Sequence, residues 1–232
     1  MAVLKDDTKK NNKVKGAGWL KGIDLPYYTG LEELLNAVSH GAGALLGAAG
    51  LVMLMRRAEG PLAMACALVF GISMILLYSN SCIYHAMPRG TALKKLFRVL
   101  DHCNVYLLVF GTYVPGALLG VSGHLGLGLS IAVGSLSLLG IVLTLIDMDR
   151  FSKICVAIHL LNGWSIIFGL PRLYRAAGGR FILFIALGGI VYSLGAILYG
   201  LGKKKRYIHS VFHLFCLAAT ALQFWGIYRY LY

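Results

Sequence analysis

Seven long apolar stretches, separated by short polar connectors, constrain this chain more than any other feature of its sequence. Crossing the ~30 Å hydrocarbon core of a bilayer takes about 20 residues of α-helix, because each residue rises about 1.5 Å. The stretches that meet this length are residues 31–55, 61–87, 97–120, 124–146, 152–172, 181–201 and 207–231. At 58% hydrophobic and 13% charged residues, the chain is too apolar for an ordinary soluble domain. The sequence therefore predicts an all-α integral membrane protein, with a seven-transmembrane-helix bundle at residues 31–232.

Lysine and arginine residues are distributed unevenly between the two sides of this bundle. If the N-terminus is inside, the inner segments hold 16 of the 22 basic residues and the outer segments hold six. Basic loops are retained in the cytoplasm. We therefore expect a multi-pass protein of the cell membrane with a cytoplasmic N-terminus and an outer C-terminus. The same bias accounts for the net charge of +13 without nucleic acid as a partner.

Residues 1–30 form a separate basic tail, which lacks the apolar core of a signal peptide. The segment from Gly18 to Ile23 is expected to lie flat at the membrane interface, with Trp19, Tyr27 and Tyr28 at headgroup depth. The five cysteines are an odd number without a CxxC spacing. They are predicted to be packing residues rather than disulfide partners or metal ligands.

Five of the seven histidines are predicted to share one layer near the cytoplasmic face. Ionisable side chains inside membrane spans are costly and therefore informative. Because the spans alternate in direction, the inner layer contains His40, His85, His102, His209 and His213. The topology depends on lysines and arginines alone, so the convergence of the histidines on one layer is independent of it.

Three of these histidines have the spacing of a metal site. His209 and His213 are four residues apart, which places both rings on one face of a helix. Together with His85 they offer three imidazoles to Zn²⁺, which binds such nitrogens at about 2.0–2.1 Å and keeps a fourth position for water. Asp101 and Ser81 are candidate catalytic residues: Asp101 would orient the bound water or accept its hydrogen bond, and Ser81 would donate to it.

Each of these residues also has a simpler interpretation when it is taken alone. The two histidines of the last span could be a polar boundary feature of the membrane interface. Asp101 could pair with Arg98 and stabilise a helix start. Ser81 could bond to the backbone of its own helix, and His85 could cap its helix beside Pro88. These alternatives weaken when the residues share one layer, because each would then be a coincidence.

The remaining polar residues of the inner layer have no assigned chemistry. Glu32 and Glu33 open the first span, where the helix dipole favours carboxylates. Asn36 and His40 share a helical face with one of these glutamates, so a supporting role near the metal is open to them.

The other histidines are not assigned to the metal. His102 follows Asp101 and points about 100° away around the helix, so the two are not expected to face one site. His124 lies in an outer turn and His159 in the middle of the fifth span.

The sequence closely resembles the hemolysin III branch of the progestin and adipoQ receptor (PAQR) family. The resemblance extends from about residue 30 to the C-terminus. Its motifs are EELLNAVSH at 32–40, SCIYH at 81–85, RVLDH at 98–102, GTYVP at 111–115 and HSVFH at 209–213.

This resemblance implies a seven-helix fold with a cytoplasmic N-terminus. It also implies a zinc ion held by His85, His209 and His213, with Ser81 and Asp101 beside the zinc-bound water. Eukaryotic members resemble lipid amide hydrolases of ceramidase type as well as hormone receptors, and bacterial members are associated with cell lysis. The short tail and the lack of a large extra domain depart from the receptor branch.

Three functions follow from these observations. The first is a zinc-dependent hydrolase of membrane lipid amides or esters, possible because zinc, an acid–base group and lipid access come together. The second is a pore-forming cytolysin, although a pore needs polar positions along several helices rather than in one layer. The third is a membrane sensor in which zinc only staples helices together. A retinal protein is disfavoured because residues 207–231 contain no lysine.

Overall fold

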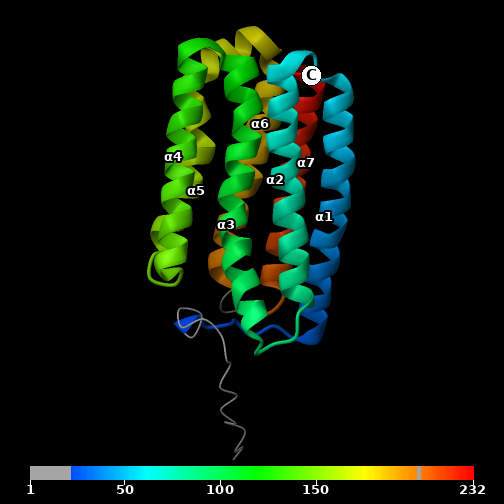
Figure 1. Cartoon of the computed structure of the whole chain (residues 1–232), viewed down its shortest axis with the longest axis vertical. Helices are drawn as coiled ribbons and strands as arrows, with labels where there is room; N and C mark the ends of the chain where they lie inside the picture. The colour runs from blue at the N-terminus through cyan, green and yellow to red at the C-terminus, as the bar shows by residue number, and fades with distance from the viewer. Residues whose placement is uncertain (1–21, 203–204) are drawn as a thin grey trace, which may run out of the picture.

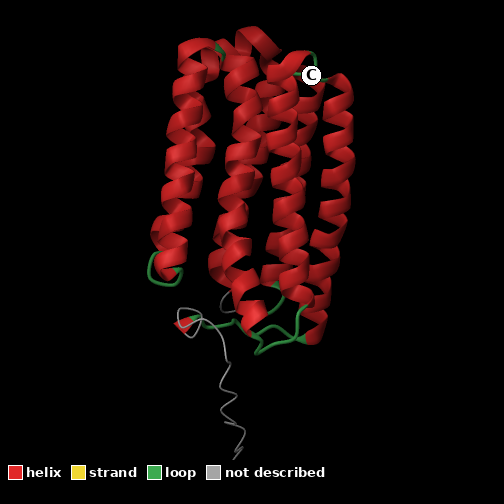
Figure 2. Ribbon diagram, viewed as in Figure 1, coloured by secondary structure: helices red, strands yellow, loops and turns green. Residues whose placement is uncertain are grey.

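The computed structural model describes residues 22–202 and 205–232, and these residues are helical apart from short connectors (Figure 2). No strand occurs within these two ranges. Most of the basic tail, including Trp19 and the greater part of the expected interfacial segment, lies outside the described residues. The expected all-α architecture is confirmed for the part of the chain that is described.

The helices run roughly along one common axis and form a bundle (Figure 1). Their bounds are α1 Gly30–Arg57, α2 Gly60–Ala86, α3 Ala92–Pro115, α4 Gly123–Asp147, α5 Ser152–Trp164, α6 Leu170–Gly202 and α7 Ile208–Tyr230. A π-helical segment, η2 (Gly116–Val121), extends α3, and a 3₁₀ segment, η3 (Ser165–Gly169), joins α5 to α6. Helix α3 begins five residues before the predicted span, because Thr91 caps it by accepting a hydrogen bond from the Lys94 amide.

Among residues 22–202 and 205–232, six helical stretches are long and apolar enough to cross a membrane. This number differs from the seven predicted spans, because the predicted spans 152–172 and 181–201 fall within one helical stretch of 51 residues, Ser152–Gly202. The stretch is interrupted at Gly178, whose φ of 76° and ψ of 174° are not helical. Glycine adopts this conformation without the steric penalty that a Cβ would impose.

Large apolar side chains cover the outer surface of the bundle. Leu45, Leu46 and Phe168 are 75%, 69% and 72% exposed, respectively. Such a surface would be costly in water, whereas lipid hydrocarbon accommodates it and leaves the backbone bonds inside each helix. The surface and the apolar helices together indicate a multi-pass membrane protein.

Glycines bring α1 close to α2 and α7. A Cβ at Gly43 would lie 2.9 Å from the ring of Tyr78 on α2, and one at Gly50 would lie 2.8 Å from the ring of Phe224 on α7. Gly47, between them, packs against the backbone of α2. Small residues allow such close approach of membrane helices. The contacts hold the start of α1, the end of α2 and the start of α7 at one end of the bundle (Figure 1).

The start of α1 is tied directly to the start of α7. Thr29 and Glu32 form a capping box, in which the Thr29 amide donates to the Glu32 carboxylate at 2.8 Å. The other carboxylate oxygen of Glu32 accepts a hydrogen bond from the Tyr207 amide at 2.7 Å. The expected role of Glu32 at a helix start is confirmed, and the same side chain also sets the position from which α7 begins.

All five cysteines are free. Cys66, Cys103, Cys155 and Cys216 are buried, and Cys82 is half-buried. The cysteines therefore act as packing residues, as predicted.

Candidate metal centre

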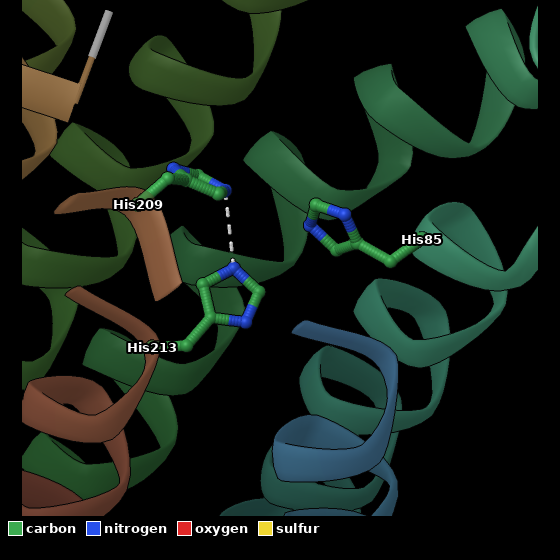
Figure 3. Close-up of side chains that lie close together, drawn as sticks. All are labelled: His85, His209 and His213. Carbon is green, nitrogen blue, oxygen red and sulfur yellow. Dashed lines mark hydrogen bonds between the residues drawn. The ribbon is translucent and has the colours of Figure 1, made fainter. Parts of the chain in front are cut away.

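Three histidines from α2 and α7 converge at the end of the bundle where α1 begins (Figure 3). One nitrogen from each of His85, His209 and His213 lies within 4.8 Å of the other two. The Nε2 atoms of His209 and His213 are 3.1 Å apart. The three residues are 2%, 9% and 1% exposed, respectively. The predicted convergence of these rings is therefore confirmed, and the cluster could hold a metal ion.

The donor atoms of this cluster fit a metal. His85 Nε2 is buried and finds no hydrogen-bond partner among the described residues. Buried polar atoms without a partner cost about 1–3 kcal/mol, so such atoms call for a partner of another kind. Two ligands at about 2.0–2.1 Å from a tetrahedral ion lie roughly 3.3 Å apart. The spacing of the α7 pair is close to that value.

The other ring nitrogen of His85 contacts a carboxylate. His85 Nδ1 lies 2.7 Å from a carboxylate oxygen of Glu33 on α1. The second carboxylate oxygen accepts a hydrogen bond from Lys94 Nζ on α3 at 2.8 Å. The alternative in which His85 caps its own helix is wrong, because neither ring nitrogen bonds to a carbonyl. The helix dipole alone does not explain Glu33, which reaches two neighbouring helices.

Ser81 and Asp101 lie together next to the cluster. Ser81 is fully buried, and its hydroxyl bonds to no backbone carbonyl of the described residues, so the backbone-bonded alternative is wrong. This hydroxyl interacts with the Asp101 carboxyl, and both side chains line one cavity. Arg98 donates to the Asp24 carbonyl and, at 3.5 Å, to Asp149. Within the described residues Arg98 makes no hydrogen bond to Asp101, but its charge still acts on the Asp101 carboxyl, so the helix-start alternative stays open.

A cavity of about 380 Å³ begins at the histidines and extends along the bundle between α3, α5, α6 and α7. Most of its wall is apolar, and Ser81, Asp101, His209 and His213 lie at one end of it. A second hollow of about 320 Å³ lies between α5 and α6. The two share wall residues, which are Val156, Leu160, Trp164, Ser193 and Ala196. The space beside the three-histidine cluster therefore continues to the gap between these two helices.

Comparison with known proteins identifies the family. The family model described as "Haemolysin-III related" matches residues 28–224. The chain belongs to this family. It is 35% identical to hemolysin-3 of Bacillus cereus over 202 residues, which cover 86% of this chain and 91% of the relative. It is 34% identical to the hemolysin-3 homolog of Bacillus subtilis (strain 168) over 206 residues, covering 88% and 96%.

A more distant relative connects the chain to the receptor side of the family. The adiponectin receptor protein of Drosophila melanogaster is 27% identical over 205 residues, which cover 71% of this chain and 44% of the receptor. The predicted membership of the hemolysin III branch of the PAQR family is thereby confirmed. Membership and the apolar helices together place the chain among multi-pass proteins of the cell membrane.

Tyr28 is a site residue of this haemolysin-III family member that the sequence did not reveal. Its ring stacks on His209, with centroids 4.8 Å apart and planes at 20°, and lies 5.7 Å from the ring of His85. Burial raises the pKa of the Tyr28 phenol above its usual range, so the ring is neutral. The sequence indicated only membrane anchoring for this residue, because no periodic pattern links it to α7.

One expectation about His102 needs correction. Asp101 and His102 both line the cavity, although they differ by about 100° around α3, because the cavity is wide enough to meet both faces. His102 Nε2 lies 3.1 Å from the Tyr199 hydroxyl. His159 also lines the cavity and stacks on Tyr106 with centroids 3.8 Å apart. Neither histidine belongs to the three-histidine cluster, as expected.

Proposed function

We propose that this haemolysin-III family member binds Zn²⁺ through His85, His209 and His213 and hydrolyses an amide or ester bond of a membrane lipid. One observation carries the proposal. The three-histidine cluster lies at the end of a largely apolar cavity, and the polar pair of Ser81 and Asp101 lies at that same end. A buried donor set, an acid–base group and an apolar chamber are the parts that lipid hydrolysis requires.

Bound zinc supplies a water of lowered pKa and polarises the carbonyl of the substrate. The residues of the chain account for the other requirements. The Asp101 carboxylate orients the attacking water and accepts its proton, and it returns that proton to the leaving amine or alkoxide as the C–N or C–O bond of the substrate breaks. The Ser81 hydroxyl, which lies beside Asp101, donates a hydrogen bond to the oxyanion that develops on the substrate carbonyl. The apolar wall excludes bulk water, which strengthens both interactions.

Membrane lipids are the proposed partners, and they reach the site from the side. The hollow between α5 and α6 shares wall residues with the main cavity, which supports entry from the hydrocarbon rather than from water. An acyl chain would occupy the apolar length of the cavity, and its polar linkage would lie at the histidine end. The wall residues Trp164 and Ser193 would flank the entering lipid.

The proposal includes seven membrane crossings with the N-terminus in the cytoplasm. A straight helix of 51 residues, the length of Ser152–Gly202, would be about 76 Å long, more than twice the ~30 Å hydrocarbon core. The turn at Gly178 allows this stretch to cross twice. The excess of basic residues on one side, 16 against six, supports a cytoplasmic N-terminus. The zinc site would then lie near the cytoplasmic face.

A second candidate function, cytolysis, is favoured by the names of the two Bacillus relatives, which are called hemolysins. The wall of the cavity is mostly apolar, whereas a pore lining needs polar side chains along its length. Lysis of red cells that depends on the size of an osmotic protectant would support a pore. Lysis that disappears together with zinc would instead support hydrolysis of the target lipids.

The experiment compares purified wild type with a variant in which His85, His209 and His213 are all alanine. We expect one zinc per wild-type chain and none in the variant, measured by elemental analysis. Wild type should release fatty acid from ceramide-like amides or from lipid esters. Asp101→Asn should retain zinc and lose this turnover. Equal zinc in the two proteins would refute the site, and zinc without turnover of any such lipid would refute the hydrolase.

A further inference from the structure

One carboxylate joins three helices beside the metal cluster. Glu33 on α1 contacts His85 on α2 through one oxygen, at 2.7 Å, and Lys94 on α3 through the other, at 2.8 Å. Lys94 Nζ also donates to the Met87 carbonyl at 2.8 Å, just beyond the end of α2. The Glu33 side chain is 20% exposed, whereas the side chains of His85 and Lys94 are buried. Glu33 therefore links the candidate ligand His85 to the buried ammonium group of Lys94.

The contact with Glu33 determines which nitrogen of His85 is free. A carboxylate accepts hydrogen bonds, so Nδ1 carries the proton and donates it to Glu33. The neutral ring then has its lone pair on Nε2, the atom that has no partner among the described residues. Asn36 Nδ2 is more distant from Nδ1, at 3.4 Å, and as a donor it cannot replace the carboxylate. Glu33 thus sets the tautomer of His85 that a metal requires, with the lone pair on Nε2.

Lys94 explains why Glu33 remains in place. Lysine is rarely buried without a partner, yet Lys94 is 2% exposed. Its ammonium lies 5.1 Å from the ring centroid of Tyr84, in addition to its bonds to Glu33 and Met87. With Nζ held at three points, the Glu33 carboxylate is fixed between two groups and loses little further freedom when a metal binds.

We propose that Glu33 is a positioning residue for the metal centre, which holds His85 with Nδ1 protonated and Nε2 directed at the ion, and that Lys94 acts through Glu33. A carboxylate behind a ligating histidine fixes the tautomer and raises the basicity of the ligand, and its loss typically costs about 10- to 100-fold in metal affinity. The inference rests on the zinc site of the proposed function and is independent of whether that site hydrolyses a lipid.

The test compares zinc affinities, measured by competition with a chromophoric chelator, in wild type, Glu33→Gln, Lys94→Met and the double variant Glu33→Gln/Lys94→Met. Each single variant leaves one buried charge unpaired and is at risk of unfolding. The double variant removes both charges and therefore retains a neutral pair. Glu59→Gln and Lys153→Met are matched controls, because both residues are exposed and neither belongs to the cluster or lines the cavity.

We expect the double variant to fold and to bind zinc about 10- to 100-fold more weakly than wild type, with both controls unchanged. Nitrogen-15 spectra of histidine in zinc-free protein should show His85 as the single Nδ1–H tautomer in wild type and as a tautomer mixture in the double variant. A folded double variant with wild-type affinity and wild-type tautomer would overturn the positioning role and leave the zinc site intact. Wild type without zinc affinity would overturn both proposals.

Discussion

The imidazole rings of His40 and His213 are stacked, with centroids 3.7 Å apart and planes at 17°. His40 is 4% exposed, and neither of its ring nitrogens has a partner within the described residues. The ring of His40 also makes an edge contact with the ring of Tyr78, with centroids 5.0 Å apart. His40 therefore forms a wall behind the candidate ligand on α7, and it does not belong to the three-nitrogen cluster.

We expect any planar aromatic side chain at position 40 to be sufficient to support the ring of His213. His40→Phe keeps the stacking surface, so zinc affinity should remain within about threefold of wild type. His40→Ala opens a void behind His213 and should lower the free energy of unfolding by about 1–3 kcal/mol. Chelator competition and thermal unfolding in detergent measure the two effects. Complete loss of zinc from a folded His40→Phe protein would show instead that His40 is a ligand.

Tyr28 is expected to slow the exchange of metal with the surrounding solution. Its ring lies against His209 and His85, and aromatic stacking contributes about 0.5–1.5 kcal/mol. Tyr28→Ala should therefore release zinc to an excess of chelator about 2- to 10-fold faster, and Tyr28→Phe should behave as wild type. The neighbouring Tyr27 is 75% exposed, so Tyr27→Ala is a matched control. Equal release rates in all four proteins would contradict this role.

The gap between α5 and α6 is expected to admit lipid. Ala196 contributes to the walls of both hollows, so Ala196→Trp should fill the passage and reduce both the uptake of a fluorescent lipid amide and its turnover, while zinc content stays at the wild-type level. Ala157→Trp is the control, because Ala157 is exposed on α5 and outside both walls. Unchanged lipid uptake in a zinc-loaded Ala196→Trp protein would argue against this route.

Close packing at Gly126 is expected to limit substitution there. A Cβ on Gly126 would clash with the Ala117 carbonyl oxygen, a backbone atom that cannot rotate away. Gly126→Ala should therefore lower the free energy of unfolding by about 1–3 kcal/mol. Gly128 lies on the same helix with no atom within 4 Å of an added Cβ, so Gly128→Ala should be neutral or slightly stabilising. Thermal unfolding of both variants in one detergent makes the comparison, and equal midpoints would be inconsistent with the close contact.

Much of the architecture could be predicted because the requirements of a bilayer are local. Apolar length identifies helices, and the predicted boundaries agree with the structure to within about five residues at the ends of α1, α2, α4 and α7. The stretch Ser152–Gly202 was less predictable. Its helix continues through residues expected to form a connector, and only the backbone conformation of Gly178 divides it. Hydropathy does not contain that conformational information.

The candidate ligands were also predictable, because two of them occupy one helix at a spacing that local geometry converts into a shared face. The amino-acid sequence by itself determined the apolar spans, the common face of His209 and His213, and their layer together with His85. Tertiary structure alone decided that Glu33 meets both His85 and Lys94, that Tyr28 lies against His209, and that an apolar cavity opens beside Asp101. Helical periodicity specifies which residues of one helix share a face, whereas the pairing of faces between helices depends on packing across the whole bundle.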